Sequence, residues 1–260
     1  MSHSSDQGDA IEFHKVSFRI DHSRDLLHDI NLAVNRGETL ILLGRSGSGK
    51  TTTLKLVNRL LTPSEGEVRV EGRPTREWDV IRLRRMTGYV IQDVGLFPHF
   101  TVERNIGLVP KIEGWPASRI QARVQELLRL VGLDPGVASH YPRELSGGQR
   151  QRVGVARALA ADPPILLMDE PFGALDPITR AELQREFLEL QKRLKKTVVF
   201  VTHDLREALL LGTRIALMDA GRLVTIKTAE EFPGSKEPLI VAYLDAFGSD
   251  FAGRRDGGRS

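Results

Sequence analysis

Hydrophobic and polar residues follow two patterns along the chain, one typical of strands and one typical of helices. Residues 11–20 and 29–35 alternate β-branched or aromatic residues with polar ones, which predicts two strands near the start. A short apolar run at 39–43 leads into a glycine-rich loop, and residues 50–61 follow helical periodicity. The sequence therefore predicts a strand, a loop and a helix in direct succession.

The middle of the chain is dominated by helical periodicity. A short strand is predicted at 88–91, and residues 118–131 then place Ile, Val and Leu side chains on one helical face. A second apolar stripe runs through 147–160. We interpret the segment of about 93–160 as an inserted α-helical subdomain.

The strand pattern resumes after the insertion. An apolar run at 165–168 is followed by a helical pattern at 179–194 and a strand pattern at 198–202. Residues 213–226 are typical of a terminal hairpin around Ala220-Gly221. Strands that alternate with helices predict an α/β fold.

Composition and charge limit the classes of function. The 260 residues are 40% hydrophobic and 27% charged, as in soluble globular proteins, and the net charge of +3 is too small to indicate nucleic acid. There is no cysteine, which excludes disulfides and Cys-ligated metals. No apolar run approaches the roughly 18 residues that a membrane-spanning helix needs, and the polar start is not a secretory signal. We expect a disordered N-terminus at 1–10, a folded domain at 11–247 and a flexible tail at 248–260.

The loop after the third predicted strand has the spacing of a phosphate-binding loop (P-loop). Its residues are Gly44, Arg45, Ser46, Gly47, Ser48, Gly49, Lys50, Thr51 and Thr52. The glycines let backbone N–H groups surround β- and γ-phosphates, and the N-terminus of the next helix faces them. Lys50 supplies a cation, and the hydroxyl of Thr51 is placed for Mg²⁺. The alternative is a chance glycine-rich turn, which the strand–loop–helix context disfavours.

Carboxylate, amide and imidazole side chains follow three other predicted strands. Asp169 and Glu170 end the run at 165–168, where Asp169 can hold Mg²⁺ and Glu170 can polarise an attacking water. The amide of Gln92 can reach both a metal and a water, and His203 can bond a γ-phosphate. Each has an ordinary alternative: an acidic pair that caps a helix, a solvated loop glutamine, and a structural histidine.

Between these two halves of the predicted nucleotide site lies the stretch Leu145-Ser-Gly-Gly-Gln149. Ser146 is suited to cap the following helix, whatever else the stretch does. Together with Gly147, Gly148 and Gln149 it also leaves free N–H groups at a helix N-terminus, which can face an anionic phosphate.

This order of motifs resembles the ATP-binding cassette (ABC) family, over about residues 11–247. The resemblance implies a P-loop NTPase (RecA-like) core with an N-terminal antiparallel β subdomain and an inserted α-helical subdomain. It implies that LSGGQ of one subunit caps the ATP of another, so that the chain forms an ATP-sandwich homodimer. The resemblance implies that Gln92 corresponds to a glutamine that contacts Mg²⁺ and senses a membrane subunit. It likewise implies that His203 is the switch histidine and that Asp176 belongs to a loop that crosses the dimer interface. The aromatic residue that stacks on adenine falls at Ile20 here, with Phe18 as the alternative contact.

Longer stretches narrow the resemblance to importer ATPases. Residues 88–99, 141–149 and 169–179 look like importers, and with 108–111 and 114–116 they are similar to the quaternary-amine osmoprotectant branch. That branch imports glycine betaine, choline or carnitine. The resemblance implies ATP hydrolysis at the cytoplasmic face of the inner membrane, with permease subunits and, indirectly, a substrate-binding protein as partners and no nucleic acid. Many members carry regulatory CBS domains, for which we expect no room before Ser260.

Three other functions are compatible with parts of the sequence. The chain could serve an importer of another small solute, such as an amino acid. It could be a soluble ABC ATPase acting on nucleic acid or ribosomes, although those usually carry coiled-coil insertions or fused cassettes. It could be a regulatory module that no longer hydrolyses ATP, against which the intact Lys50, Asp169, Glu170 and His203 argue.

Overall fold

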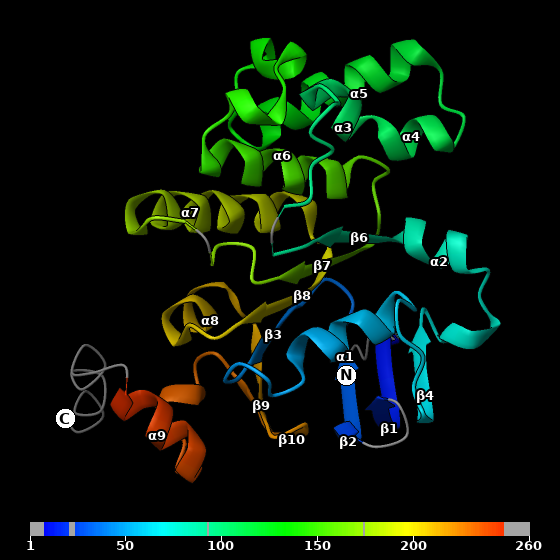
Figure 1. Cartoon of the computed structure of the whole chain (residues 1–260). Helices are drawn as coiled ribbons and strands as arrows, with labels where there is room; N and C mark the ends of the chain where they lie inside the picture. The colour runs from blue at the N-terminus through cyan, green and yellow to red at the C-terminus, as the bar shows by residue number, and fades with distance from the viewer. Residues whose placement is uncertain (1–7, 21–23, 93, 174, 247–260) are drawn as a thin grey trace, which may run out of the picture. The chain divides into compact units, whose positions relative to one another are not determined.

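The computed structural model describes residues 8–20, 24–92, 94–173 and 175–246 (Figure 1). The predicted flexible segments at 1–10 and 248–260 lie outside the described residues, except for 8–10. The chain divides into two compact units, one formed by the residues up to Pro74 together with those from Val199, the other by Thr75–Val198. The fold is the predicted α/β P-loop NTPase core with an antiparallel β subdomain and α-helical elements.

The first unit begins with a four-stranded antiparallel sheet of order β2-β1-β4-β5. Its strands are β1 (Ile11–Ile20), β2 (Arg24–Val34), β4 (Glu65–Val70) and β5 (Arg73–Pro74). Ile11, Phe13 and Val16 of β1 are buried, whereas His14 and Lys15 between them are exposed. The two predicted N-terminal strands are confirmed, but β4 and β5 had no prediction because Glu65–Val70 carries charges and a glycine.

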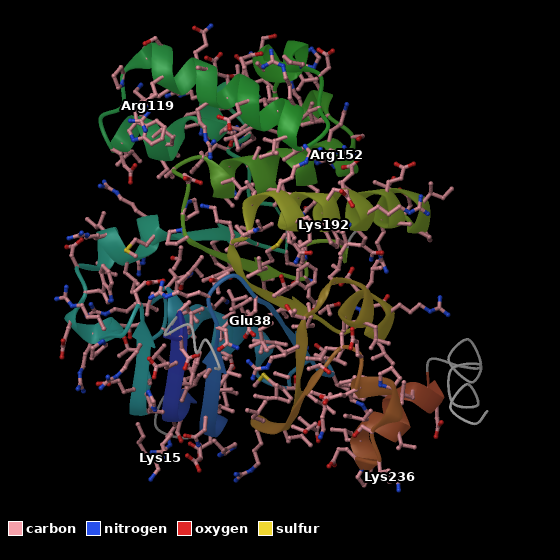
Figure 2. All side chains as sticks on the ribbon, turned by 180° about the vertical axis from the view of Figure 1, so that it is seen from behind. Lys15, Glu38, Arg119, Arg152, Lys192 and Lys236 are labelled. Atoms are coloured by element: carbon pink, nitrogen blue, oxygen red, sulfur yellow. The ribbon has the colours of Figure 1, made fainter. Side chains whose placement is uncertain are left out.

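The same unit holds part of a second sheet, in the order β10-β9-β3-β8. These strands are β3 (Thr39–Leu43), β8 (Thr197–Thr202), β9 (Arg214–Asp219) and β10 (Arg222–Thr228), and β8 contains the boundary between the units. Strand β3 is buried throughout and pairs in parallel with β9. Strands β9 and β10 form the predicted hairpin, turning at Ala220-Gly221. Glu38 accepts a hydrogen bond from Arg214 (3.1 Å), which ties the start of β3 to β9; Figure 2 labels Glu38.

The helices of the first unit are α1 (Lys50–Val57), α8 (Leu205–Leu211) and α9 (Pro238–Ala246). Helix α1 contacts both β2 and β4, so it packs on the antiparallel sheet while its first residue completes the P-loop. The predicted helix at 50–61 is confirmed up to Val57. It ends there because Asn58 departs from helical geometry and Arg59 has a left-handed backbone (φ 53°).

In the second unit, strands β6 (Thr87–Val90) and β7 (Ile165–Asp169) pair in parallel, with Val90 opposite Met168. Its helices are α2 (Val80–Met86), α3 (Val102–Ile106), α4 (Leu108–Ile112), α5 (Ala117–Leu130), α6 (Gly147–Leu159) and α7 (Pro177–Leu194). Helices α3–α6 pack on one another and bury the predicted apolar face of α5. The limits of the helical insertion, at about 93 and 160, stay a prediction.

Candidate functional site

The P-loop curls between β3 and α1 because its glycines adopt backbone angles that other residues avoid. Gly47 has φ 81° and Gly49 has φ 99°, both in the left-handed region. Gly44 is required for a different reason: a Cβ there would lie 2.4 Å from the carbonyl oxygen of Met218. The loop therefore lies directly against the end of β9.

The turn between β9 and β10 is hydrogen-bonded to this loop and holds it in place. The N–H of Gly221 donates to the Ser48 carbonyl (3.2 Å), and the carbonyl of Gly221 accepts from the N–H of His28 on β2 (2.9 Å). A Cβ on Gly221 would lie 2.5 Å from the carbonyl oxygen of Leu26, so only glycine fits. One turn thus fixes the P-loop to both sheets of the first unit.

Two polar side chains of the P-loop are buried in a way that suits an anionic ligand. Lys50 is 4% exposed, and its ammonium group donates to the carbonyls of Gly44 and Arg45 (both 2.8 Å). The hydroxyl of Ser48, in a side chain 2% exposed, has no hydrogen-bond partner among the described residues. Leaving a buried hydroxyl unpaired costs about 1–3 kcal/mol. A phosphate group supplies oxygens that accept from both side chains, so these residues fit the predicted ligand.

His203 follows the carboxyl end of β8, which neighbours β3 in the sheet. Its side chain is exposed, while Asp204 caps α8 by accepting from the N–H groups of Arg206 (2.8 Å) and Glu207 (3.3 Å). In addition, the Asp204 N–H donates to the hydroxyl of Thr202 (3.0 Å). This fixed junction holds the imidazole at a strand end in the first unit, as the sequence predicted.

In the second unit, β6 and β7 run in parallel, so their carboxyl ends lie at the same edge of the sheet. Asp169 ends β7, Glu170 follows it, and Gln92 follows β6, which brings all three to this edge. Asp169 is buried and accepts a hydrogen bond from the hydroxyl of Tyr89 on β6. Burial, with the negative charge of Asp169 and this bond, raises the pKa of Tyr89, so the phenol stays protonated. Tyr89 was missed from the sequence, because pairing it with Asp169 requires the register of two distant strands.

Glu170 has an unusual backbone. Its φ of 43° lies in the left-handed region, which a residue with a Cβ seldom adopts. Its carbonyl accepts from the N–H of Gly173 (3.1 Å), and this turn keeps the strained conformation in place. Strained backbone is found at functional sites, where the surrounding structure holds it in place.

The LSGGQ stretch forms a self-capped helix start. The hydroxyl of Ser146 accepts from the N–H of Gln149 (3.2 Å), and the side-chain carbonyl of Gln149 accepts from the N–H of Ser146 (2.9 Å). A Cβ on Gly148 would lie 2.6 Å from the methyl carbon of Thr179, so α6 approaches the first turn of α7 closely. The capping role of Ser146 is confirmed.

Asp176 lies at that first turn and caps α7. Its carboxylate accepts from the N–H groups of Ile178 and Thr179 (both 3.1 Å). A hydrogen bond with the side chain of Thr179 has the largest effect on the pKa of Asp176, followed by the bond from the Thr179 backbone, and together they lower this pKa from its ordinary value. Ile178, the second residue of α7, is 74% exposed, an apolar side chain on the surface beside the LSGGQ stretch.

The predicted adenine contact lies at the end of β1. Ile20 pairs with Arg24 and is 42% exposed, whereas Phe18 pairs with Leu27 and is half-buried. The choice between Ile20 and Phe18 as the base contact stays open.

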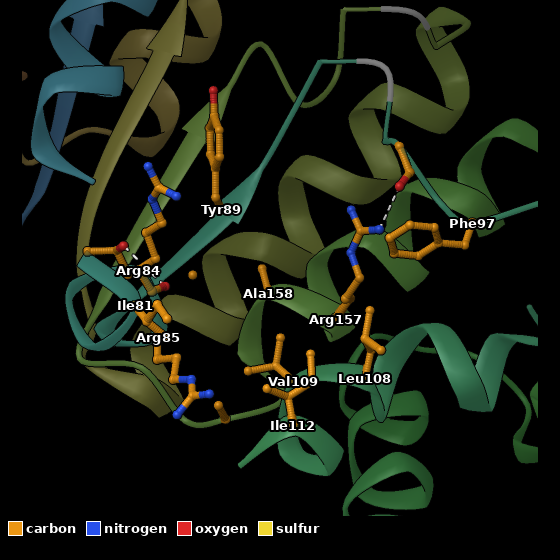
Figure 3. A pocket seen from close by; sticks show the side chains of 14 residues that line it. Ile81, Arg84, Arg85, Tyr89, Phe97, Leu108, Val109, Ile112, Arg157 and Ala158 are labelled. Carbon is orange, nitrogen blue, oxygen red and sulfur yellow. Dashed lines mark hydrogen bonds between the residues drawn. The ribbon is translucent and has the colours of Figure 1, made fainter. Parts of the chain in front are cut away.

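A groove of about 470 Å³ opens on the second unit between α2, α4 and α6 (Figure 3). Its apolar lining includes Ile81, Val109 and Ile112, and Arg84 and Arg85 stand at one side. The loop after Gln92 contributes Phe97, which is 41% exposed, whereas Leu96 and Phe100 are half-buried. Of these three apolar residues, Phe97 is the one that lines the groove.

Comparisons with known proteins agree with this arrangement. Residues 27–173 match the family described as ABC transporter. The chain is 50% identical over 221 residues to a glycine betaine/carnitine/choline transport ATP-binding protein of Bacillus subtilis, covering 85% of this chain and 58% of that protein. It is 53% identical over 216 residues to an osmoprotectant import ATP-binding protein of Salmonella typhimurium, covering 80% of this chain and 56% of that protein. It is 50% identical over 214 residues to a glycine betaine uptake system ATP-binding protein of Escherichia coli, covering 82% of this chain and 69% of that protein. The chain thus spans little more than half the length of the first two.

Solved structures show the same fold. The dimeric ATP-binding cassette MJ0796 bound to ADP and Pi superposes with a TM-score of 0.76 at 34% identity, covering 84% of this chain and 98% of that one. The cbiO1 protein of Clostridium perfringens, part of an ABC transporter complex, gives a TM-score of 0.81 at 27% identity, covering 91% and 95%. No helix within the described ranges is long and apolar enough to cross a membrane. The chain belongs to the ABC transporter family.

Proposed function

We propose that the chain is the ATP-hydrolysing subunit of an ABC importer for a small osmoprotectant such as glycine betaine, choline or carnitine. The observation that carries the hydrolytic part is the end of β7, where the Tyr89 hydroxyl bonds a buried Asp169 and the next residue, Glu170, has a strained backbone. Burying a carboxylate costs free energy, and a metal cation bound beside Asp169 would offset that cost.

The P-loop binds the phosphates of ATP through its backbone N–H groups, the Lys50 ammonium and the Ser48 hydroxyl. Thr51, Gln92 and Asp169 would hold Mg²⁺, in keeping with an ion that takes one or two carboxylates together with substrate phosphates. When bound, Mg²⁺ would neutralise negative charge that develops on the phosphates during hydrolysis. Glu170 orients the attacking water and accepts its proton, and His203 donates a hydrogen bond to the γ-phosphate.

A second copy of the chain is the partner that the LSGGQ stretch fits. Its helix N-terminus and exposed Ser146 offer N–H groups to an anion, while Ile178 beside it leaves an apolar side chain on the surface. The MJ0796 cassette, which is similar in fold, is dimeric with ADP and Pi. In the proposed homodimer, ATP lies between the P-loop of one protomer and Ser146, Gly147, Gly148 and Gln149 of the other, with Asp176 at the interface.

The groove of the second unit fits a permease segment. An apolar floor with Ile112 and Phe97 exposed at its sides suits the apolar face of a short helix. Arg84 and Arg85 favour an acidic residue on that helix. In this proposal the chain is a peripheral subunit at the cytoplasmic face of the inner membrane, with the substrate-binding protein as an indirect partner and no nucleic acid.

Two experiments test the proposal at its two levels. The purified chain should hydrolyse ATP only with Mg²⁺, and a chain that releases no phosphate under these conditions contradicts the enzymatic part. In the source organism, deletion of the gene should abolish uptake of radiolabelled glycine betaine, choline or carnitine at high osmolarity and leave amino-acid uptake unchanged. Loss of amino-acid uptake alone would assign the importer to another solute.

A further inference from the structure

The loop that follows Gln92 has a backbone that needs support from elsewhere. Strand β6 ends at Val90, and Val94 and Gly95 then adopt left-handed angles of φ 53° and φ 54°. Glycine tolerates this conformation, whereas a β-branched valine is among the residues that most disfavour it. A contact outside the loop must therefore hold Val94 in place.

Arg157 of helix α6 supplies that contact. One terminal nitrogen of its guanidinium donates to the carbonyl of Gly95 (2.7 Å) and the other to the carbonyl of Val94 (2.6 Å). Figure 3 shows the side chain crossing from the helix to the loop beside Phe97. The guanidinium uses two separate nitrogens for these two carbonyls, whereas a lysine at the same position has a shorter side chain with a single terminal nitrogen.

A second contact lies one turn earlier on the same helix. A Cβ on Gly154 would lie 2.7 Å from a methyl carbon of Val94, so α6 and the loop are packed as closely as a glycine allows. Residues three apart share a helix face. Gly154 and Arg157 thus form one contact surface, which carries both the packing and the hydrogen bonds of the loop.

The next part of the loop is fixed to α3. The fully buried Asn105 accepts from the N–H of Phe97 (2.8 Å) through its side-chain carbonyl. Its amide nitrogen donates to the carbonyls of Phe97 (3.2 Å), Phe100 (3.1 Å) and Thr101 (3.0 Å). The described loop from Val94 to Thr101 is therefore bound at both ends to helices of the helical block, and Gln92 lies two residues before its first anchor.

We propose that Arg157 is a positioning residue that ties the loop after Gln92 to helix α6, the helix that begins at Ser146. Arg157, Gly95 and Phe97 all line the groove, so a segment bound there presses on the anchored loop. Because the guanidinium joins loop and helix, the same displacement reaches Gln92 at one end and the LSGGQ start of α6 at the other. This inference rests on the proposed function for the roles of Gln92 and Ser146.

The test is Arg157→Lys, which keeps the charge and loses the paired hydrogen bonds. The full-length variant should bind the non-hydrolysable analogue AMP-PNP as wild type does, within about twofold. Its kcat for ATP should fall by about 10- to 100-fold, the range expected when a catalytic group is displaced by about 1 Å. Hydrogen exchange at the backbone amides of residues 94–101 should become faster.

Arg123→Lys is the matched control. Arg123 of α5 also donates to two carbonyls, those of Leu159 (2.9 Å) and Ala160 (3.3 Å), but these lie at the end of α6 and not in the loop. A purely structural role for such arginines predicts similar losses of kcat in both variants. Our inference predicts a loss in Arg157→Lys alone, with kcat of Arg123→Lys within about twofold of wild type.

Gly154→Ala keeps Arg157 intact and serves if Arg157→Lys does not fold. Alanine favours the helix, but its methyl group must displace Val94, so kcat should fall again with AMP-PNP affinity preserved. Faster exchange at 94–101 with unchanged kcat in either variant overturns the inference, as does an equal loss of kcat in Arg123→Lys. A wild-type chain that does not hydrolyse ATP would instead remove the proposed function.

Discussion

The two glycine-rich helix starts of this protein are built in opposite ways. At the start of α1, Ser48 has an unpaired hydroxyl, and the buried Lys50 ammonium bonds carbonyls of the loop itself. At the start of α6, Ser146 and Gln149 satisfy each other in a capping box, and Ser146 is exposed. Both present N–H groups at a helix N-terminus, where an anion is favoured.

We infer from this difference that the P-loop serves to bind ATP, whereas the LSGGQ stretch serves to join two protomers. The P-loop carries a buried hydroxyl, that of Ser48, whose burial costs free energy until a phosphate accepts from it, so we infer that the loop binds ATP without a second protomer. At the LSGGQ start, the Ser146 and Gln149 side chains are already hydrogen-bonded in the free chain, so they gain less from a ligand alone. We infer that this stretch acts only when another protomer brings a phosphate to it.

The largest loss of ATP turnover should follow from a change at Glu170, which belongs to neither helix start. Glu170→Gln removes the carboxylate that accepts the proton of the attacking water, so ATP turnover should fall by about 100-fold or more. ATP binding should persist, and the dimer should stay closed. The measurements are phosphate release and light scattering in ATP, with Glu189→Gln on the exposed side of α7 as control. Unchanged turnover would remove Glu170 from the mechanism.

A pair of substitutions tests the comparison directly. Lys50→Ala removes a charged donor from the P-loop and should weaken ATP binding by about 10- to 100-fold. Ser146→Arg should leave ATP affinity of the free chain within about twofold and abolish most turnover, because it blocks the surface offered to the other protomer. Titration calorimetry and phosphate release separate the two. Equal losses of affinity would show that both helix starts bind the same ATP molecule in one chain.

The unpaired hydroxyl of Ser48 gives two effects of opposite sign. In Ser48→Ala, the free energy of unfolding of the ligand-free chain should rise by about 1 kcal/mol, since a buried unsatisfied group is removed. ATP affinity should fall by roughly tenfold, because a hydrogen bond to a charged phosphate is lost. Urea unfolding and calorimetry measure both, with the exposed Ser139→Ala as reference. A variant weaker in both respects would show that Ser48 has a partner in the free protein.

The smallest effect concerns the base. Ile20 offers adenine an apolar contact without an aromatic face, so Ile20→Tyr should tighten ATP binding by about 1 kcal/mol. The wild-type chain should discriminate poorly between ATP and GTP, because the P-loop recognises phosphate and ignores the base. Dissociation constants for both nucleotides on both chains test this. A wild type that strongly prefers ATP, with no gain in the variant, would point to Phe18 as the stacking residue.

The parts of the molecule that the sequence predicted are those set by neighbouring residues. The P-loop, the helix after it, the hairpin at Ala220-Gly221 and the capping role of Ser146 depend on local glycines, periodicity and spacing. The residues that were missed act over long sequence separations. The contact of Tyr89 with Asp169 depends on the register between β6 and β7. The hydrogen bond from Arg157 to Val94 depends on how helix α6 packs against the loop. No local pattern encodes either contact.

In the proposed homodimer, ATP joins two copies of this chain through the P-loop of one and the LSGGQ stretch of the other. This arrangement is tested most directly by the structure of the ATP-bound Glu170→Gln variant. The expected structure is a dimer in which Ser146 of each protomer lies within hydrogen-bond distance of the γ-phosphate held by Lys50 of the partner. A contact between Ser146 and the ATP of its own chain, or an ATP-bound monomer, would contradict it.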